Sequence, residues 1–365
     1  MNKHEYCVIL AGGIGSRFWP VSTEYEPKQF HVVNGLGISF LQNTYKRMLR
    51  AIPEENIYVA SLARYKDQVM EQLPGISEDR LILEPYRRNT ATTIVYAALL
   101  LMHRDPEAIM VATPADHSIG DPELFDNTIR QAVEHVAAND VLLTLGIVPT
   151  RPDTNFGYIQ VAGGSEVYTT GKPVLAKTFT EKPDAELAKV FVDSGEFLWN
   201  SGIFIWKADF VLQEMKECCP EFSHIWENWK EAFGGDDKES FVEKAYAGSP
   251  SISIDYALME KSDKVWILPV SFKWGDMGSW STFYDAIKDD SDNGNAVRTA
   301  GPRIVKNLKG DMVYTTDSGK LTVIRGLENF LVVDTDDTLL ICPRDDKELQ
   351  EVLSEIALPE FEKYK

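Results

Sequence analysis

The sequence predicts an α/β protein built on a doubly wound, Rossmann-like sheet with helices on both faces. Short, continuously apolar runs alternate with segments of helical patterning through the first half of the chain. This alternation indicates β-α-β units, and strands without polar alternation indicate a sheet covered on both faces. After about residue 290 the pattern changes to short apolar runs separated by Asp and Gly, which predicts a small all-β domain.

The strands expected in the larger domain are the apolar runs at residues 6–10, 56–61, 80–85, 108–114 and 141–149. Apolar residues at helical spacing predict helices at residues 41–52, 65–73, 90–103 and 122–138. Three later runs, "PVLAKTFTEKP", "GIFIWK" and "KVWILPV", predict strands that make the sheet mixed. Because 365 residues exceed the roughly 100–200 of one domain, we expect two domains, over residues 1–290 and 291–365.

Composition excludes several classes of protein. The net charge of −19 argues against nucleic-acid binding, which needs a basic face. No run of about 18 apolar residues occurs, so we expect no membrane segment. The N-terminal residues lead directly into a strand without the apolar region of a secretory signal, and the four cysteines fit buried free thiols better than a zinc site. We therefore expect a cytoplasmic protein.

Residues suited to phosphate and metal chemistry follow three of the expected strands. A glycine-rich loop with Arg17 follows the first strand, "RRN" follows the strand in "LILEPY", and Asp116 with His117 follows "IMVATP". Ligands of open α/β sheets bind at the carboxyl ends of strands. We therefore expect these side chains to contribute to a binding site.

The glycine-rich loop at residues 12–17 can be compared with known phosphate-binding loops. It lacks the third glycine and the later acid of a dinucleotide-binding fingerprint, which disfavours a redox enzyme, and it lacks the Gly-Lys-Ser/Thr of a Walker A loop. A polyanion site remains, with exposed backbone N–H groups and with Arg17 and Lys28 as cations. A tight turn is the alternative for the loop taken alone.

The stretch "LAGGIGSRFWPVSTEYEPKQF" resembles the signature of the sugar-1-phosphate nucleotidylyltransferases. The resemblance covers residues 8–285 in order, through "EPYRRNTA", "ATPADHSI", "GIVPTRPDTNFGYIQ", "FTEKP", "LWNSGIFIW" and "WGDMGSW". Trp19-Pro20, "PKQF" and "EPYRRNTA" are similar to the guanylyltransferase branch, which joins GTP to mannose 1-phosphate and releases pyrophosphate. The resemblance implies the nucleotide-diphospho-sugar transferase fold and a catalytic domain over residues 1–290.

The resemblance also implies the residues that hold the nucleotide and the metal. Arg17 would favour departure of pyrophosphate, and Lys28 would neutralise the phosphates near the attack. Asp116 and Asp276 would bind Mg²⁺, which prefers oxygen ligands. His117 is expected to have a structural or supporting role, because an ionised phosphate needs no histidine base. The implied nucleotide-binding residues are Leu10, Ala11, Gly12, Gly13, Gly15, Ser16, Arg17, Arg87, Arg88, Asn89, Thr90, Pro114 and Asp116.

The sugar side of the site is implied by the later motifs. Gly157 and Tyr158 would bring backbone close to the hexose, Glu181 and Lys182 would grip a sugar hydroxyl and the sugar phosphate, and Asn200 would contact another hydroxyl. Read from the residues alone, Glu181 and Lys182 also fit an exposed ion pair of little energetic value.

Two alternatives for the function stay open at this point. One is an enzyme for glucose 1-phosphate with UTP or dTTP, and the other is a regulatory subunit that binds a nucleotide sugar without turnover. The β-rich tail resembles the left-handed β-helix-like C-terminal domain of these enzymes, which implies a homodimer. Because the sequence stops at Lys365, before a cupin-type isomerase domain, we expect no isomerase activity.

Overall fold

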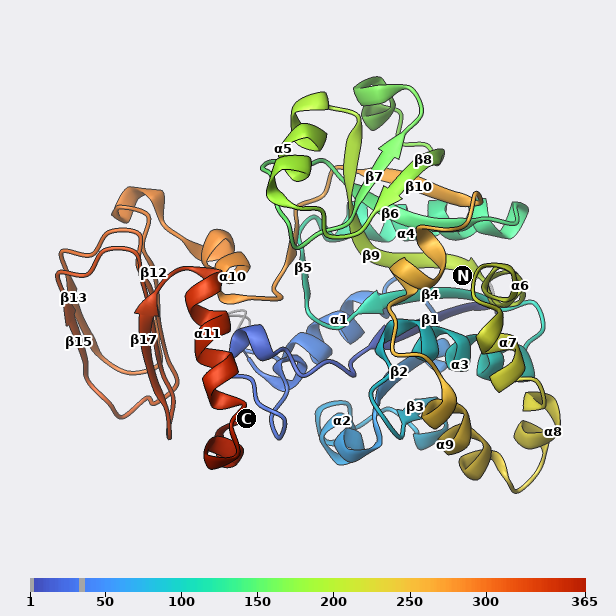
Figure 1. Cartoon of the computed structure of the whole chain (residues 1–365), viewed down its shortest axis with the longest axis horizontal. Helices are drawn as coiled ribbons and strands as arrows, with labels where there is room; N and C mark the ends of the chain where they lie inside the picture. Colours follow the sequence, from blue (N-terminus) through green and yellow to red (C-terminus); the bar gives the residue numbers. More distant parts are fainter. Residues whose placement is uncertain (1–2, 33–36) are drawn as a thin grey trace. The chain divides into compact units, whose positions relative to one another are not determined.

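The computed structural model describes residues 3–32 and 37–365 (Figure 1). The chain forms two compact units, each assembled from three separate stretches of sequence. Unit 1 comprises Met1–Gly12, Leu41–Ala115 and Ile119–Trp274, and unit 2 comprises Gly13–Phe40, Asp116–Ser118 and Gly275–Lys365. The chain therefore alternates repeatedly between the two units.

Unit 1 is built on a mixed sheet, which confirms the predicted fold class at this level. Among the described residues the sheet has nine strands in the order β3-β2-β1-β4-β9-β6-β10-β8-β7. The first four run parallel, whereas β9 is antiparallel to both β4 and β6. The strands are β1 (Glu5–Leu10), β2 (Ile57–Leu62), β3 (Leu81–Glu84), β4 (Ile109–Pro114), β6 (Leu142–Ile147), β7 (Tyr158–Val161), β8 (Val174–Thr180), β9 (Phe197–Lys207) and β10 (Val265–Val270).

Helices connect these strands, as the alternating pattern predicts. The four helices expected from the first half of the sequence are present, and their ends lie within a few residues of the predicted ones. Further helices follow β8 and β9. The helices are α1 (Phe40–Met48), α2 (Lys66–Gln72), α3 (Asn89–Arg104), α4 (Pro122–Ala138), α5 (Ala185–Ser194), α6 (Ala208–Cys218), α7 (Pro220–Ile225), α8 (Trp229–Gly234) and α9 (Lys238–Gly248).

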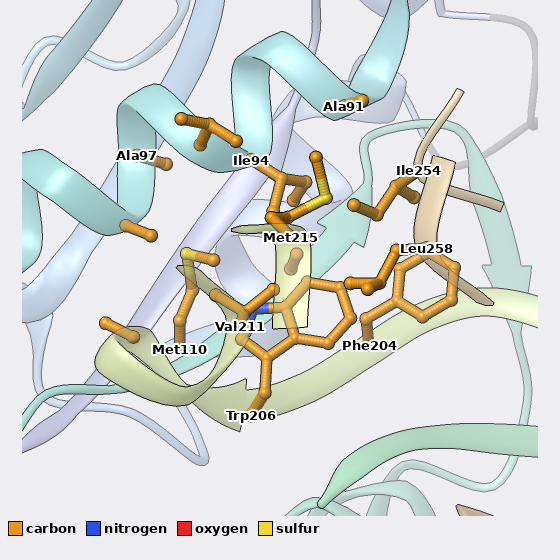
Figure 2. Close-up of a cluster of buried hydrophobic side chains, with 14 of the residues drawn as sticks. Ala91, Ile94, Ala97, Met110, Phe204, Trp206, Val211, Met215, Ile254 and Leu258 are labelled. Carbon is orange, nitrogen blue, oxygen red and sulfur yellow. The ribbon is translucent and has the colours of Figure 1, made fainter. Parts of the chain in front are cut away.

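The main core of unit 1 lies where α3 and α6 pack beside β9 (Figure 2). Trp206 of β9 is fully buried and is among the largest side chains of this cluster. Small residues on α3, including Ala91 and Ala97, leave room for Met215 of α6. Truncating such a buried tryptophan to alanine typically costs about 3–5 kcal/mol, so this cluster contributes strongly to the stability of the sheet that positions the site.

Unit 2 is rich in short parallel strands. One sheet has the order β12-β14-β16-β17 and a second pairs β13 with β15. The strands are β12 (Ala296–Thr299), β13 (Arg303–Lys306), β14 (Met312–Thr315), β15 (Thr322–Arg325), β16 (Phe330–Asp334) and β17 (Leu339–Pro343). All their pairings are parallel except that of β17 with β16.

The expectation that the tail is entirely β was wrong. Helix α11 (Asp346–Ile356) follows β17 and packs against it (Figure 1). Asp345 caps the helix by accepting a hydrogen bond from the backbone N–H of Lys347 at 2.7 Å. Leu349, Val352 and Leu353 recur at helical spacing and join the core of unit 2. This spacing predicts a helix, whereas the short strands that precede it led to the expectation of an all-β domain.

The core of unit 2 joins the start of the sequence to its last third. Phe18 stacks on Trp280 of α10 (Trp280–Ile287), with ring centroids 4.4 Å apart. The indole N–H of Trp280 donates to the carbonyl oxygen of Trp19 at 2.8 Å. These contacts hold the segment with Arg17 and Lys28 in one unit with the segment that carries Asp276.

Candidate active site

Asp116, His117 and Asp276 form a cluster in unit 2. Asp116 precedes β5 (His117–Ile119), and Asp276 ends β11 (Trp274–Asp276), which pairs with β5. One ligand atom of each of the three side chains lies within 4.8 Å of the other two. The structure therefore brings together the two acids that the sequence proposed as metal ligands, and their role as ligands stays a prediction.

The donor set of this cluster can be compared with what Mg²⁺ requires. Two carboxylates fit an ion that usually takes one or two carboxylates together with substrate phosphates. His117 is buried and adds an imidazole nitrogen at the same place. Imidazole is a ligand that transition metals prefer more than Mg²⁺ does. Sequence reasoning kept His117 away from the metal, although its position beside Asp116 in "PADH" was the available signal.

Lys28 lies in the same cluster. It begins a short 3₁₀ turn (Lys28–Phe30), and its side chain is buried. Its Nζ lies 2.5 Å from Oδ2 of Asp116 and donates to the carbonyl oxygen of Met277 at 2.8 Å. A lysine held in this way is not the solvated surface residue that would have been the alternative.

The pKa of Asp116 follows from this pairing. Burial alone raises the pKa of a carboxyl group, but the positive charge of Lys28, assisted by His117, outweighs burial and lowers the pKa of Asp116 to about 2. Asp116 is therefore ionised at neutral pH, as a metal ligand must be.

The glycine-rich loop continues into unit 2 after Gly12. Gly15 has a φ of +71°, and a Cβ at this position would lie 2.7 Å from Cβ of Lys28. Only glycine satisfies both conditions, so the loop can lie directly on Lys28. Gly13 is exposed with open space around it, and Ser16 and Arg17 begin the 3₁₀ turn (Ser16–Phe18) that follows.

The segment after β3 that is predicted to bind the nucleotide contains one exposed arginine and two residues with partners in later segments. Arg87 is exposed, as a ligand-binding cation can be. Arg88 instead donates from Nε to the carbonyl oxygen of Tyr246 at 2.8 Å. The hydroxyl of Thr90 accepts a hydrogen bond from the backbone N–H of Ile254 at 2.9 Å. Arg88 and Thr90 thus hold later segments of unit 1 in place.

Sequence reasoning missed Glu84 at the end of β3. Its Oε1 accepts hydrogen bonds from the hydroxyls of Thr93 at 2.5 Å and Tyr246 at 3.1 Å. Its Oε2 lies against the loop, because a Cβ on Gly12 would be only 2.6 Å away. Burial raises the pKa of Glu84 to about 7 despite the two hydrogen bonds. An acid that ends a buried strand before a proline was the signal in the sequence.

A second cluster in unit 1 contains the predicted sugar residues. Glu181 and Lys182 follow β8, and the Nζ of Lys182 lies 2.6 Å from Oε1 of Glu181. The backbone N–H of Asn200 on β9 donates to the carbonyl oxygen of Gly157 at 2.8 Å. A Cβ on Gly157 would collide with Oε2 of Glu181, so only glycine allows this approach. Four of the five predicted residues are thus close together.

Tyr158, the fifth, has a different place. Its ring is fully buried, and its hydroxyl donates to the carbonyl oxygen of Asp153 at 3.0 Å and accepts from the Asp153 N–H at 2.9 Å. The side chain therefore stabilises the preceding loop through the backbone of Asp153. Only the backbone of Tyr158 remains for the predicted role beside Gly157.

Asp255 also belongs to this cluster and was missed. It begins a π-helical turn (Asp255–Met259), and its Oδ1 accepts a hydrogen bond from Nδ2 of Asn200 at 2.9 Å. Burial and the negative charge of Glu181 raise the pKa of Asp255 to about 7, while Lys182 acts in the opposite direction. No periodic pattern or motif in the sequence marks this aspartate.

Comparison with known proteins identifies a family whose model matches most of this chain. Residues 6–293 match the model of a family described as nucleotidyl transferase. The chain belongs to the nucleotidyl transferase family. The match covers all the residues of both clusters.

Individual proteins are similar to this chain over most of its length. A mannose-1-phosphate guanylyltransferase from Salmonella muenchen is 36% identical over 93% of this chain and 70% of its own length. The xanthan biosynthesis protein XanB from Xanthomonas campestris pv. campestris strain B100 is 36% identical over 96% of this chain and 72% of its own. A Thermus thermophilus crystal structure, described as a mannose-1-phosphate geranyltransferase, is similar with a TM-score of 0.85 and 28% identity, covering 97% of this chain and 100% of that one.

Within residues 3–32 and 37–365, no helix combines the length and the apolar character needed to cross a bilayer.

Proposed function

We propose that this chain is a mannose-1-phosphate guanylyltransferase, an enzyme that makes GDP-mannose and pyrophosphate from GTP and α-D-mannose 1-phosphate. A phosphate oxygen of the sugar attacks the α-phosphorus of GTP. The bond from that phosphorus to the bridging oxygen breaks, and pyrophosphate leaves with the electron pair. The observation that carries the proposal is the cluster of Lys28, Asp116 and Asp276 in a chain 36% identical to a guanylyltransferase over 93% of its length.

Unit 2 supplies the groups that would act on the triphosphate. The carboxylates of Asp116 and Asp276 would hold Mg²⁺, which neutralises phosphate charge when bound. Lys28 is fixed by Asp116 and by Met277, so its ammonium group is already oriented before substrate arrives. Arg17 and the N–H groups of the glycine-rich loop would hold the outer phosphates, and the other nucleotide-binding residues predicted from the sequence keep that role in the proposal.

Unit 1 supplies the groups that would hold the sugar phosphate. Lys182 has a half-exposed side chain whose ammonium group suits a phosphate, and Glu181 has a buried side chain whose carboxylate suits a hydroxyl. Gly157 leaves room beside Glu181, and the amide of Asn200 lies in the same cluster. No histidine or other base is required, because the attacking phosphate is already ionised.

The alternatives are less well supported. A regulatory subunit without turnover would be expected to lack catalytic groups, yet Arg17, Lys28, Asp116 and Asp276 are all present and three of them cluster. An enzyme for glucose 1-phosphate would share the fold, but the relative from Salmonella muenchen is described as a mannose-1-phosphate enzyme.

Pyrophosphate release tests the proposal directly. Four nucleoside triphosphates would be combined with mannose, glucose and fucose 1-phosphates in the presence of Mg²⁺. GTP with mannose 1-phosphate should give the highest kcat/KM. Faster turnover with a different sugar or base would reject the proposed branch, and no turnover with any pair would favour the regulatory alternative.

We infer that residues 1–290 form a catalytic domain and that residues 291–365 form a left-handed β-helix-like domain. The second part is supported by the strands β12 to β16, which alternate between two sheets. A homodimer is supported by the exposed Leu339 and Ile341 on β17, which would be covered by a second copy. Light scattering would test the dimer.

A cytoplasmic location is supported by four free cysteines.

A further inference from the structure

We propose that Asp255 binds a hydroxyl of the hexose directly, beside Glu181, and so helps to determine which sugar 1-phosphate is accepted. The inference rests on the proposed function, since it adds a second carboxylate to the same sugar site. It differs from the sequence-based expectation, in which Asn200 contacts the second hydroxyl.

The first observation is an unpartnered acceptor on Glu181. The side chain of Glu181 is only 6% exposed, and its Oε1 is paired with Lys182. Within the described residues nothing donates a hydrogen bond to Oε2, although this atom is buried. Buried carboxylate oxygens normally have a donor. Oε2 lies over the backbone of Gly157, where a side chain is absent, so a ligand hydroxyl is a suitable donor.

The second observation concerns the orientation of Asn200. Its Oδ1 accepts hydrogen bonds from the hydroxyl of Thr144 at 2.9 Å and from the N–H of Gly202 at 3.2 Å. These bonds fix the amide so that Nδ2 points to Asp255, at 2.9 Å from Oδ1. Asn200 is thus a positioning residue that holds the carboxylate of Asp255 in one orientation.

The third observation is the position of Asp255. As a whole residue Asp255 is half-buried, so it is not sealed from a ligand. It is close enough to Glu181 and Lys182 for their charges to act on it. The carboxylates of Glu181 and Asp255 repel each other, and one lysine does not neutralise both, so the arrangement costs free energy. Such arrangements of charged groups are typical of functional sites.

The chemistry of the cluster matches a sugar phosphate. A hexose 1-phosphate offers one dianion and several neighbouring hydroxyls that can each donate a hydrogen bond. Lys182 suits the phosphate, and Glu181 and Asp255 suit two hydroxyls. Epimers move a hydroxyl away from its acceptor, and a site built to accept a hydrogen bond from a hydroxyl discriminates strongly against sugars that cannot supply it.

The test combines Asp255→Asn with deoxy sugars. The panel experiment first identifies the hexose 1-phosphate that the wild type uses, whichever it is, and its 2-deoxy, 3-deoxy, 4-deoxy and 6-deoxy analogues are then compared. We expect Asp255→Asn to lower kcat/KM for the full substrate by about 10–100-fold. For the one analogue that lacks the contacted hydroxyl, the effect of the substitution should fall to less than about 3-fold.

The controls separate binding from structure. Asp263→Asn changes an exposed acid near the same segment and should leave all kinetic constants unchanged. The KM for GTP and the melting temperature of Asp255→Asn should match the wild type. An equal loss with every analogue, or no loss at all, would overturn the inference, whereas a different preferred sugar would reject only the proposed function.

Discussion

The carboxylates of Asp116 in unit 2 and Asp255 in unit 1 both lie near a lysine, yet their pKa values move in opposite directions. Asp116 lies 2.5 Å from the nearly buried Lys28, and its pKa falls to about 2. Asp255 shares the half-exposed Lys182 with Glu181, which is the acid that the lysine contacts, and its pKa rises to about 7. At Asp116 the direct contact with a buried lysine outweighs burial and lowers the pKa, whereas at Asp255 burial and the charge of Glu181 outweigh Lys182 and raise the pKa.

This difference suits two kinds of ligand. A cation or a charged transition state needs fully ionised, rigidly held groups, as at Asp116. A neutral hydroxyl needs acceptors placed by their neighbours, as at Asp255. Substitutions at Lys28 and Asp276 alter the first site, and Gly157→Ala alters the second. Glu84→Gln alters a buried acid that contacts no lysine in the described part of the chain.

Lys28→Met should have the largest effect. It removes the cation that holds Asp116 and that would neutralise the phosphates, so we expect kcat to fall by about 100–1,000-fold. Steady-state kinetics would measure this. Lys309→Met is the matched control, because Lys309 forms an exposed ion pair with Glu328 in the same unit and should leave kcat unchanged. A change confined to KM would assign Lys28 to ordinary substrate binding.

Asp276→Asn should be next. The loss of one charged ligand should raise the Mg²⁺ concentration needed for half-maximal turnover and lower kcat by about 100-fold. The melting temperature should change little, because Asp276 is partly exposed. Asp336→Asn, at an exposed position of unit 2, is the control. Unchanged Mg²⁺ dependence would remove Asp276 from the metal site.

Glu84→Gln tests the effect of burial on a carboxyl group that has no lysine partner within the described residues. Because the pKa of Glu84 rises from 4.5 to about 7 on folding, the folded protein binds more protons than the unfolded chain between these values. The free energy of unfolding therefore decreases as the pH rises through this window, by about 3 kcal/mol from this group.

Denaturant unfolding at several pH values would measure this decrease. The Gln variant should lose that part of the pH dependence, and the part due to Asp255 should remain. The side chains facing Glu84 are Thr93 and Tyr246, and neither carries a compensating charge at these pH values. The same slope in both proteins would contradict the assignment.

Gly157→Ala should have the smallest effect of the four. The added Cβ would meet Oε2 of Glu181 and displace this carboxylate, so we expect the KM for the sugar 1-phosphate to rise about 10-fold with the KM for GTP unchanged. Gly248→Ala, where the nearest neighbour of a Cβ is 4.0 Å away, is the control. Equal changes in both KM values would show that the substitution disturbs more than the sugar site.

The elements with strong local patterns were predictable from the sequence. The buried strand β1, helix α3 and the mixed sheet follow from apolar runs, helical spacing and alternation. The pairing of Asp116 with Asp276 was implied by the resemblance of "ATPADHSI" and "WGDMGSW" to the motifs of the family. Lys28 was identified, but its ion pair with Asp116 was not, because the two residues come from different stretches of sequence.

Other features depend on contacts that no local pattern encodes. Asp255 matters because Asn200 points at it, and nothing in "SISIDYALME" indicates that partner. Tyr158 and Arg88 stand in motifs, yet their polar groups serve the fold. The composition of unit 2 was equally hidden, since Gly13–Phe40 and Gly275–Lys365 belong together only through packing.

That packing bears on how the protein is made. Phe18 emerges early from the ribosome and stacks on Trp280, and Trp19 donates from its indole N–H to the carbonyl oxygen of Tyr364 at 2.7 Å. Unit 2 cannot complete its core until almost the whole chain has been translated, because loops of this length must close first. A nascent chain can therefore form the sheet of unit 1 well before the cluster of Lys28, Asp116 and Asp276 is complete, so a prematurely terminated product would lack this cluster.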